Sequence, residues 1–335
     1  MVYNFNMINA YATKKAKTKI EPFSYEENIG PSDVLIQISY CGICHSDVHL
    51  IDGDWGEVYP LVPGHEILGT IIEIGDMVTE LKNGDTVGTG WQCSSCHKCK
   101  QCNQSNEHFC KENIATCMDH HGGFADKVVV NEGFAIKIPN EMNKPSTAPL
   151  LCGGITVYSP LKKYAEKNSH VAIVGIGGLG HIALQIAKAM GCKVTALSRS
   201  PEKEKESREF GANNFLLEPE INTYDLILNT AHVTLPMEKY IAALQPEGVF
   251  VQLGISPEPV TMNWSELIMN NKVITGSSTG SPDEIKEFLE FAHKNNIAAK
   301  IELMSMNTVN EAVEKVRSNK ARYRVVLEND LTENS

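Results

Sequence analysis

Four cysteines crowd into one short segment near residue 100. They stand at Cys96, Cys99, Cys102 and Cys110. Four thiolates suit a closed tetrahedral zinc ion that leaves no position for a substrate. Cys93, His97 and His108 lie nearby in the sequence, so one of the ligands could be assigned differently. We therefore predict a structural zinc ion at this segment, which would pin a loop that has little apolar core of its own.

A second set of possible metal ligands is spread along the chain. Its members are Cys44 in CGICHSD, His65 and Glu66 in PGHE, and Cys152 in LLCGG. A catalytic zinc ion needs three protein ligands and an open fourth position, and two cysteines with one histidine form a recognised set. Each residue alone also has an ordinary interpretation, such as a small buried thiol or a hydrogen-bonded turn histidine. Together they predict a catalytic zinc site.

A glycine-rich turn stands between an apolar run at residues 170–176 and a segment of helical periodicity at residues 179–190. Its sequence GIGGLG fits the pattern G-x-G-x-x-G, and its candidate contacts are Gly175, Gly177, Gly178, Leu179 and Gly180. The first glycine permits a tight turn, the second lets the backbone approach a pyrophosphate, and the third lets helix and strand pack closely. Because free amide groups at a helix start hold phosphates, this context predicts a dinucleotide site.

The end of the next expected strand distinguishes the two nicotinamide dinucleotides. NAD sites usually carry an acidic residue there, which accepts a hydrogen bond from the ribose 2′-hydroxyl. Here the sequence KVTALSRS offers no carboxylate. Ser198 and Ser200 can donate hydrogen bonds to a 2′-phosphate, and Arg199 and Lys203 can supply positive charge. An ordinary solvated basic turn is the alternative, but the pattern favours NADP(H), with NAD(H) as the second choice.

Composition excludes several classes of function. The 335 residues suggest about two domains, and 30 basic against 41 acidic residues give a net charge of −11. A surface of that sign offers no general grip on nucleic acid or anionic lipid. We find neither a signal-peptide pattern nor a run near the roughly 20 apolar residues that span a bilayer. Clustered thiols without a secretory signal are typical of a reducing compartment, so we expect a cytoplasmic protein.

The hydrophobic patterns divide the chain into parts. Alternating segments at 33–41, 69–75 and 124–130 indicate a β-rich first part. After about residue 152, short apolar runs alternate with helix-periodic segments, which indicates an α/β doubly wound parallel sheet. Its expected strands are 170–176, 193–197, 225–230, 249–253 and 273–275. Helices at 283–295 and 309–318 and a strand at 323–327 are expected in the tail.

These motifs together resemble a known family. GICHSDVH, PGHEILGTI, the four-cysteine loop, LLCGGITVYSPL, GIGGLGHIALQIAKAMG and ARYRVV are similar to motifs of the zinc-dependent medium-chain alcohol dehydrogenases. The resemblance is to the cinnamyl-alcohol-dehydrogenase-like branch and runs from about residue 8 to 328. It implies a GroES-like catalytic domain at 1–151 and 288–335 and a Rossmann dinucleotide-binding domain at 152–287. It also implies a homodimer, with a tetramer as the alternative, that acts on a small alcohol or aldehyde.

The resemblance also implies residue roles. Cys44, His65 and Cys152 would bind the catalytic zinc ion, Glu66 would be an alternative ligand, and Asp47 would orient a ligand histidine. Ser46, in place of the commoner threonine, and His49 would relay the proton, and Trp55 and Trp91 would line the substrate pocket. The implied cofactor contacts are Thr156 at the nicotinamide, Ser198 and Arg199 at the 2′-phosphate, Arg324 at the pyrophosphate with Arg322 as the alternative, and Thr230, Gly254, Ser277 and Ser278.

The sequence therefore predicts a zinc-dependent alcohol dehydrogenase or aldehyde reductase that exchanges a hydride between a primary alcohol or aldehyde and NADP(H). Two other classes stay open. A zinc-free quinone reductase of the same superfamily would need neither Cys44 nor Cys152. A non-catalytic zinc-buffering or redox-sensing protein would use the cysteine loop alone, and it would leave the spacing of Ser46 and His49 and the glycine turn unexplained.

Overall fold

The computed structural model describes residues 6–256 and 258–331, and the chain divides into two compact units. The first unit comprises Met1–Cys152, Gly280–His293 and Ala298–Ser335, and the second comprises Gly153–Thr279 and Lys294–Ile297. The predicted limits 152–287 differ at their second boundary, because helix α7 (Pro282–Lys294) lies almost wholly in the first unit. There the Ser105 hydroxyl donates a hydrogen bond to the Asp283 carboxylate at 3.0 Å.

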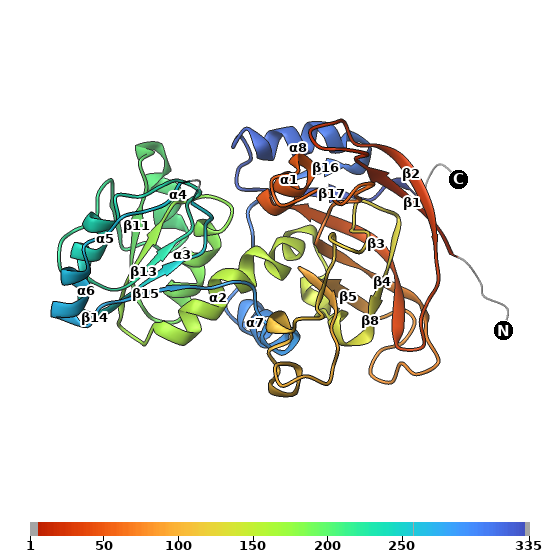
Figure 1. The fold of residues 1–335 in the computed structure, drawn as a ribbon, viewed down its shortest axis with the longest axis horizontal. Helices are drawn as coiled ribbons and strands as arrows, with labels where there is room; N and C mark the ends of the chain where they lie inside the picture. Colours follow the sequence, from red (N-terminus) through yellow and green to blue (C-terminus); the bar gives the residue numbers. More distant parts are fainter. Residues whose placement is uncertain (1–5, 257, 332–335) are drawn as a thin grey trace. The chain divides into compact units, whose positions relative to one another are not determined.

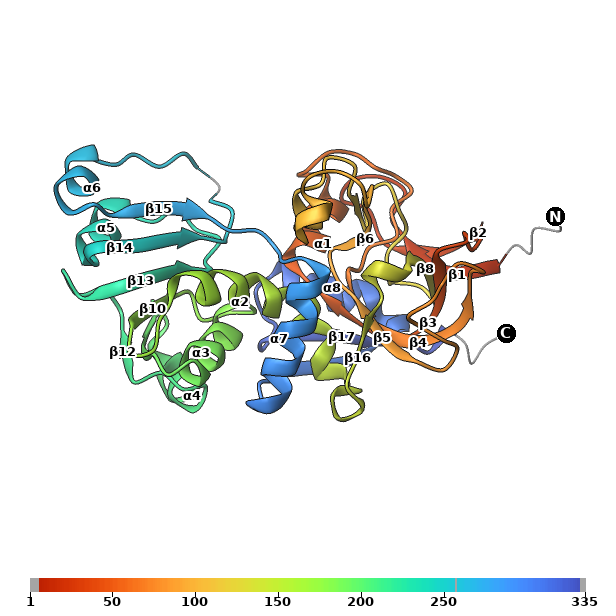
Figure 2. The same ribbon diagram turned by 90° about the horizontal axis from the view of Figure 1, so that it is seen from below.

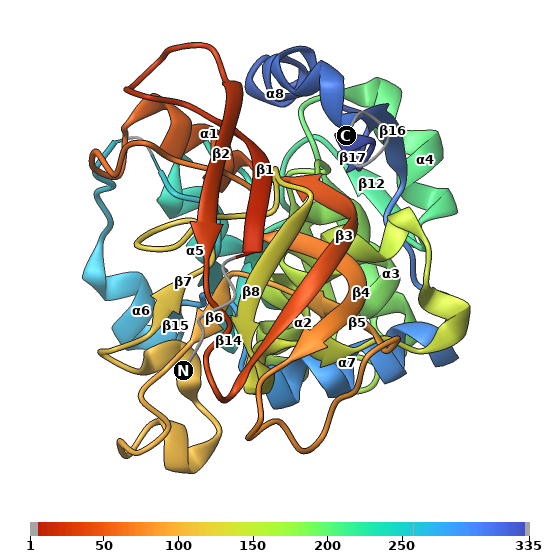
Figure 3. The same cartoon turned by 90° about the vertical axis from the view of Figure 1, so that its right-hand side faces the viewer.

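The first unit is built on a seven-stranded mixed sheet of strand order β16-β17-β3-β4-β5-β9, in which β8 also pairs with β3. Strands β3, β4 and β8 lie side by side in Figure 3. The strands are β3 (Asp33–Ile43), β4 (Glu66–Ile74), β5 (Thr86–Thr89), β8 (Lys127–Asn131), β9 (Ile136–Lys137), β16 (Ile301–Ser305) and β17 (Arg324–Glu328). Two small antiparallel pairs are β1 (Asn6–Ala12) with β2 (Glu21–Glu27), and β6 (Gln92–Ser94) with β7 (Ile114–Ala115).

Helices α1 (His45–Asp52) and α8 (Val309–Arg317) belong to the first unit. Helix α8 buries residues at helical spacing, and it lies next to α1 and against β16 and β17 (Figure 1). The Arg317 guanidinium donates two hydrogen bonds, of 2.9 and 3.1 Å, to the Asp52 carboxylate. This bidentate pair ties the end of α8 to the last residue of α1 and so fixes the helix that carries the predicted relay residues.

The second unit is a six-stranded, fully parallel sheet of order β12-β11-β10-β13-β14-β15. Figure 2 shows β13, β14 and β15 side by side with their arrows pointing the same way. The strands are β10 (His170–Val174), β11 (Lys193–Leu197), β12 (Asn214–Leu216), β13 (Tyr224–Asn229), β14 (Leu244–Gln252) and β15 (Val273–Gly276). The chain reverses its direction of winding between β10 and β13, which is where such sheets bind dinucleotides.

Helices accompany this sheet, and the helix expected at residues 179–190 is among them. They are α2 (Gly153–Tyr164), α3 (Gly180–Ala189), α4 (Glu204–Glu209), α5 (Met237–Ala243) and α6 (Trp264–Asn270). Val171, Ala172 and Ile173 of β10 are fully buried, as a strand covered on both faces requires. The predicted fold class, a GroES-like β-rich domain with a Rossmann-type parallel sheet, is confirmed.

Some elements carry no clear local signal and were not predicted. Strands β1 and β2 are missing from the expected elements, and so are α1 and α2. Helix α1 is short and polar, and α2 begins with two glycines and contains Pro160, all of which weaken a helical pattern. Within residues 6–256 and 258–331, no helix has both the length and the apolar character that a membrane crossing requires.

Candidate active site and metal centres

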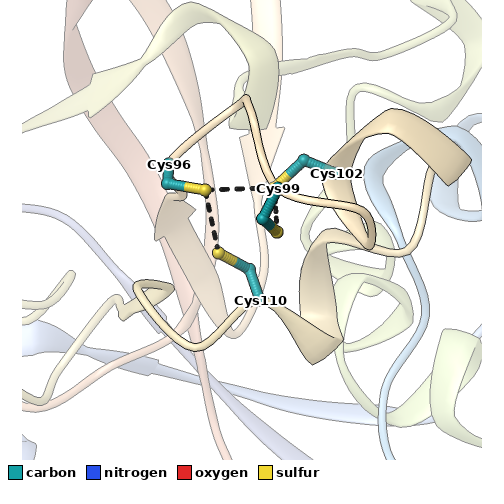
Figure 4. A group of neighbouring side chains, drawn as sticks. All are labelled: Cys96, Cys99, Cys102 and Cys110. Carbon is teal, nitrogen blue, oxygen red and sulfur yellow. Dashed lines mark hydrogen bonds between the residues drawn. The ribbon is translucent and has the colours of Figure 1, made fainter.

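The four predicted cysteines meet in the loop between β6 and β7 (Figure 4). Their Sγ atoms all lie within 4.8 Å of one another. The separations are 3.5 Å for Cys96 and Cys110, 3.6 Å for Cys99 and Cys102, and 3.9 Å for Cys96 and Cys102. A hydrogen bond from the backbone of Lys98 helps to lower the pKa of Cys96 to about 7, which favours the thiolate. Four converging thiols fit a structural zinc ion, as predicted.

The neighbouring candidates stand apart from this group. The Cys93 thiol donates to the Ile114 carbonyl at 3.6 Å, and burial raises its pKa to about 12, so it stays neutral. The His97 ring meets Phe134 and the His108 ring meets Phe109, at centroid distances of 6.0 and 3.9 Å. The ligand set is therefore the four cysteines that the spacing indicated.

The dispersed set also converges, and it lies wholly within the first unit. The ligand atoms of Cys44, His65, Glu66 and Cys152 lie within 4.8 Å of one another. Cys44 immediately precedes α1, His65 and Glu66 stand at the start of β4, and Cys152 follows a short helical segment, Pro145–Leu151. All four side chains are buried.

The donors of this second group fit a zinc ion. The buried Nε2 atom of His65 has no hydrogen-bond partner among the described residues, and it faces a group that holds two thiols. The hydrogen bond with Cys152 holds the pKa of the Cys44 thiol well below its ordinary value. A buried imidazole nitrogen without a partner is costly unless an ion completes it. Two cysteines and one histidine leave the fourth position for a substrate oxygen, which is the arrangement of a catalytic zinc site.

Asp47 connects the two ligand-bearing segments. Its fully buried carboxylate accepts hydrogen bonds from the Cys44 amide at 2.8 Å, the Gly64 amide at 2.9 Å and His65 Nδ1 at 2.8 Å. The proton on Nδ1 leaves Nε2 as the metal-binding atom. The buried Cys117 thiol lies 4.0 Å from Asp47 Oδ1 and 3.9 Å from His65 Nδ1. The sequence analysis missed Cys117 because no pattern of ligand spacing surrounds it.

Glu66 is paired with Arg324 of β17. The Arg324 Nη2 atom donates to Glu66 Oε1, and both side chains are buried. Burial raises the pKa of Glu66 to about 7. Burial alone would lower the pKa of Arg324, but the attraction of Glu66 raises it. Gly42 stands opposite Glu66 in the register of β3 and β4, and a Cβ atom there would collide with the Glu66 carboxylate. The predicted contact of Arg324 with a pyrophosphate stays a prediction.

Of the two predicted relay residues, Ser46 lies beside a zinc ligand, and His49 contacts a carboxylate and an aromatic ring. Ser46 Oγ lies 3.7 Å from the Sγ atom of Cys44, and His49 Nδ1 lies 2.8 Å from Asp54 Oδ2. Trp55 stacks on the His49 ring at a centroid distance of 5.0 Å. Asp54 was not among the sequence predictions, although a carboxylate five positions after a relay histidine was a signal that could have found it.

The predicted pocket tryptophans, Trp55 and Trp91, lie between the His49 ring and the His65 ring. Trp91 packs edge-to-face with Trp55 and with the His65 ring, at centroid distances of 6.3 and 4.9 Å. Both tryptophans are partly buried against the core of the first unit. An aromatic wall therefore runs from His65 to His49, the predicted relay histidine, and it leaves an apolar boundary next to the metal group.

The glycine turn follows β10 in the second unit. Gly175 has φ +84°, which favours glycine, and a Cβ atom there would lie 2.9 Å from that of Ala231. Gly177 has open space where a side chain would stand, whereas a Cβ atom on Gly180 would collide with the Gly175 carbonyl. Gly178 and Leu179 complete the turn before α3. These are the three distinct glycine requirements of a dinucleotide-binding turn.

The other predicted cofactor residues cluster at the carboxyl edge of the same sheet. Thr230 follows β13, Gly254 follows β14, and Ser277 and Ser278 follow β15. Thr156 lies in the first turn of α2, partly exposed. The carboxyl ends of parallel strands share one edge, so the sheet order brings residues from three separate strands together.

The segment after β11 holds the predicted NADP-preferring residues. The Ser198 hydroxyl accepts a hydrogen bond from the Ser200 amide at 3.2 Å, and the Arg199 side chain is exposed. The Lys203 Nζ atom donates to the Ile176 carbonyl oxygen at 2.7 Å. None of the described residues after β11, up to the start of α4, is acidic except Glu202.

Comparisons with known proteins agree with this geometry. Residues 30–140 match the alcohol dehydrogenase GroES-like domain, and residues 178–294 match the zinc-binding dehydrogenase family. The aldehyde reductase AdhA of Synechocystis sp. is 39% identical over 331 residues, covering 96% of this chain and 98% of that protein. A probable cinnamyl alcohol dehydrogenase of Populus deltoides is 37% identical over 340 residues, covering 96% and 95%.

Solved structures are similar over the whole fold. A cinnamyl alcohol dehydrogenase from Sorghum bicolor superposes with a TM-score of 0.92 at 35% identity, covering 96% of this chain and 98% of that one. A Helicobacter pylori cinnamyl alcohol dehydrogenase solved with NADP(H) gives a TM-score of 0.91 at 33% identity, covering 97% and 99%. The chain therefore belongs to the zinc-containing medium-chain alcohol dehydrogenases. Within this family it falls in the branch of the cinnamyl alcohol dehydrogenases and aldehyde reductases.

The structural zinc site predicts a difference in metal content. We expect the Cys110→Ser variant to carry one zinc ion fewer per chain than the wild type, because a hydroxyl is a much poorer zinc ligand than a thiolate. The Cys93→Ala variant is the matched control and should keep the wild-type zinc content. Elemental analysis of the purified proteins measures this. Loss of zinc from the Cys93→Ala variant instead would contradict the four-cysteine assignment.

Proposed function

We propose that this zinc-dependent alcohol dehydrogenase works with NADP(H) on a small primary alcohol or the corresponding aldehyde, with aldehyde reduction as the preferred direction. The observation that carries the proposal is the buried Cys44–His65–Cys152 group, whose orphaned imidazole nitrogen lies beside an aromatic wall. That group provides a dry site with one open coordination position, which suits a small oxygen-bearing substrate.

The residues of the chain divide the chemical work. A zinc ion held by Cys44, His65 and Cys152 supplies, when bound, a Lewis acid that lowers the pKa of an alcohol or polarises an aldehyde carbonyl. The nicotinamide, when bound, accepts or supplies the hydride. We assign to Ser46 the task of taking the alcohol proton at its hydroxyl oxygen and to His49 the task of passing it onward.

Asp54 determines which ring nitrogen of His49 carries the proton in the proposed relay. Its carboxylate accepts from His49 Nδ1 at 2.8 Å, so the proton on Nδ1 is held in place and Nε2 is left to receive the proton from the substrate side. About half of the Asp54 side chain is exposed, so the far end of the relay is open to water. This arrangement supports proton exchange with solvent at each turnover.

The preference for NADP(H) is supported by the segment after β11. Ser198 and Ser200 present hydroxyl groups there, and the exposed Arg199 offers a guanidinium that matches a phosphate in a bidentate manner. The similar Helicobacter pylori enzyme was solved with NADP(H). NAD(H) is the alternative cofactor.

The two alternative classes of protein, a zinc-free reductase and a non-catalytic sensor, would each require only part of the residues present. A zinc-free reductase would have no use for the dispersed thiol and imidazole group, and a sensor built on the cysteine loop would have no use for the glycine turn. Both features are present in the chain with complete donor sets. Two zinc ions per chain together with NADPH binding are the combination that only the proposed enzyme requires.

The catalytic zinc site predicts the behaviour of a single thiol variant. We expect Cys44→Ser to lower aldehyde turnover with NADPH by at least about 10²-fold, because an electrostatic stabiliser of the reacting oxygen is lost. NADPH binding, followed by nucleotide fluorescence, should stay close to that of the wild type. Cys192→Ser, a buried thiol of the second unit that donates to the Glu166 carbonyl, is the matched control and should keep its turnover. Wild-type turnover in Cys44→Ser would disprove the metal mechanism.

Cofactor choice is tested at Arg199. We expect Arg199→Ala to weaken NADPH binding by about 10- to 100-fold and NADH binding by less than about twofold, because only NADPH carries the 2′-phosphate. Lys205→Ala, which removes an exposed cation of the neighbouring helix α4, should change neither affinity. Dissociation constants from fluorescence titration measure both, alongside an aldehyde panel run with each nucleotide. Equal losses for the two nucleotides would contradict a 2′-phosphate contact.

We propose a homodimer, for which one face of the second unit offers a suitable surface. Strand β15 is the edge of the parallel sheet, and Trp264, Ile268 and Met269 of α6 are 68%, 70% and 79% exposed. A free strand edge beside exposed apolar side chains favours pairing with another chain. A tetramer is the alternative assembly.

The assembly is tested by a charge placed on this surface. We expect Ile268→Glu to convert the dimer to a monomer at micromolar concentration, because burying an unpaired carboxylate at an interface is unfavourable. Ile221→Glu, at a residue that is 77% exposed outside α6 and β15, should remain dimeric. Sedimentation velocity distinguishes the states. A monomeric wild type would contradict the proposed assembly.

A further inference from the structure

Three consecutive carbonyl groups of the glycine turn each accept a hydrogen bond from a different side chain. The pairs are Thr230 Oγ1 with the Gly175 carbonyl at 2.7 Å, Lys203 Nζ with that of Ile176 at 2.7 Å, and His181 Nδ1 with that of Gly177 at 3.0 Å. A carbonyl oxygen only accepts, so Nδ1 of His181 carries the proton in its pair. The three donors come from three places in the sequence: the end of β13, the segment after β11, and the first turn of α3.

These bonds determine where the amide groups of the turn point. In a planar trans peptide, the carbonyl of one residue and the N–H of the next lie on opposite sides. Carbonyl groups that are held toward the side chains therefore direct the N–H groups of Ile176, Gly177 and Gly178 away from them. No described residue accepts a backbone hydrogen bond from these three amides, so they are available to a ligand. Gly177 has open space on its outer side.

Two of the three donors lie behind the turn rather than in front of it. His181 is fully buried and Thr230 is 6% exposed. The His181 ring meets the edge of Phe210 at a centroid distance of 5.4 Å, which limits its rotation. The amide of His181 also donates to the Gly177 carbonyl, at 3.2 Å, so the side chain adds a second bond to the same oxygen. His181 and Thr230 thus contact the turn from its inner side.

A pyrophosphate next to this turn would be sensitive to the direction of its peptide groups. Carbonyl oxygens carry partial negative charge and repel an anion, whereas amide groups attract it. If the carbonyl groups of the turn could rotate outward, the turn would attract the pyrophosphate less and repel it more. Holding the carbonyls inward in advance removes that reorganisation from the binding step.

We propose that Thr230 and His181 form a carbonyl clamp, a pair of positioning residues that orients the amides of Ile176 and Gly178 toward the pyrophosphate of the dinucleotide. The clamp rests on the proposed dinucleotide function. It serves NADPH and NADH alike, because both contain the pyrophosphate. His181 and Thr230 act through the turn and not by touching the nucleotide.

The clamp is tested at His181 with a donor-deleting and a donor-keeping variant. In His181→Leu the bulk stays and the donor is lost, whereas the side-chain amide nitrogen of His181→Asn occupies the place of Nδ1. We expect His181→Leu to weaken NADPH binding at least about 10-fold while changing adenosine 2′-monophosphate binding less than about twofold. This second probe lacks the pyrophosphate. His181→Asn should bind NADPH within about threefold of the wild type.

Thr230 supplies an independent measurement. We expect Thr230→Val, which replaces the hydroxyl by a methyl group of equal size, to weaken NADPH and NADH binding by the same factor, because the pyrophosphate is common to both. A loss confined to NADPH would overturn the part of Thr230 in the clamp. This variant also repeats the test should His181→Leu fail to fold.

The outcomes separate the clamp from the proposed function. A wild-type protein that binds neither nucleotide contradicts the dinucleotide function itself. A wild type that binds NADPH, together with unchanged binding in His181→Leu and Thr230→Val, overturns the clamp alone. Equal losses of NADPH and adenosine 2′-monophosphate in His181→Leu also overturn it, because they indicate a general disruption of the unit and no specific effect on the pyrophosphate.

Discussion

The carboxylate of Asp47 is the group on which the geometry of the catalytic centre depends. Removing a carboxylate from water is costly, and here three hydrogen bonds offset that cost. The donors come from two segments, the start of α1 and the turn before β4. The Asp47 carboxylate therefore joins the two backbone segments that bear Cys44 and His65. Because Asp47 also fixes the proton of His65 on Nδ1, it determines which imidazole nitrogen faces the metal group.

The rest of the first unit holds this arrangement in place. Helix α1 carries Asp47 together with Ser46 and His49, so one short helix supplies both the orientation of a ligand and the proposed path of a proton. The bidentate bond from Arg317 to Asp52 secures the other end of that helix against α8. Glu66, the first residue of β4, is neutralised by Arg324 of β17 across β3, which makes the sheet register part of the site.

The second unit has a different physical task. In the proposed function, its backbone amide groups bind the pyrophosphate, which is an anion. The parallel order of the sheet places β10 next to β13, and this adjacency brings the Thr230 hydroxyl behind the turn that follows β10. The return of the chain after β11 brings Lys203 to the same turn. The tertiary fold thus satisfies the carbonyl groups of the turn and leaves its amide groups available, which a glycine pattern alone does not ensure.

Much of the fold could be predicted because its signals are local. The apolar runs at β10, β11 and β13 reflect strands buried on both faces, and the helical periodicity of α3 and α8 reflects one buried stripe on each. Strands β1 and β2 and helices α1 and α2 were missed, because glycine, proline and polar residues there are stabilised by long-range packing and not by local preference.

The sequence by itself determined the chemistry of the two cysteine-containing metal sites and of the glycine turn. Ligand type and close spacing are properties of the chain before it folds, and the four-cysteine loop carries its whole site within one segment. Only the tertiary structure decided the contacts between distant residues. Examples are Cys117 beside His65, Thr230 behind the glycine turn, and Arg324 on Glu66. The reason is physical: which donor meets which acceptor across 52 to 258 positions depends on sheet order and register, and no local spacing encodes that pairing.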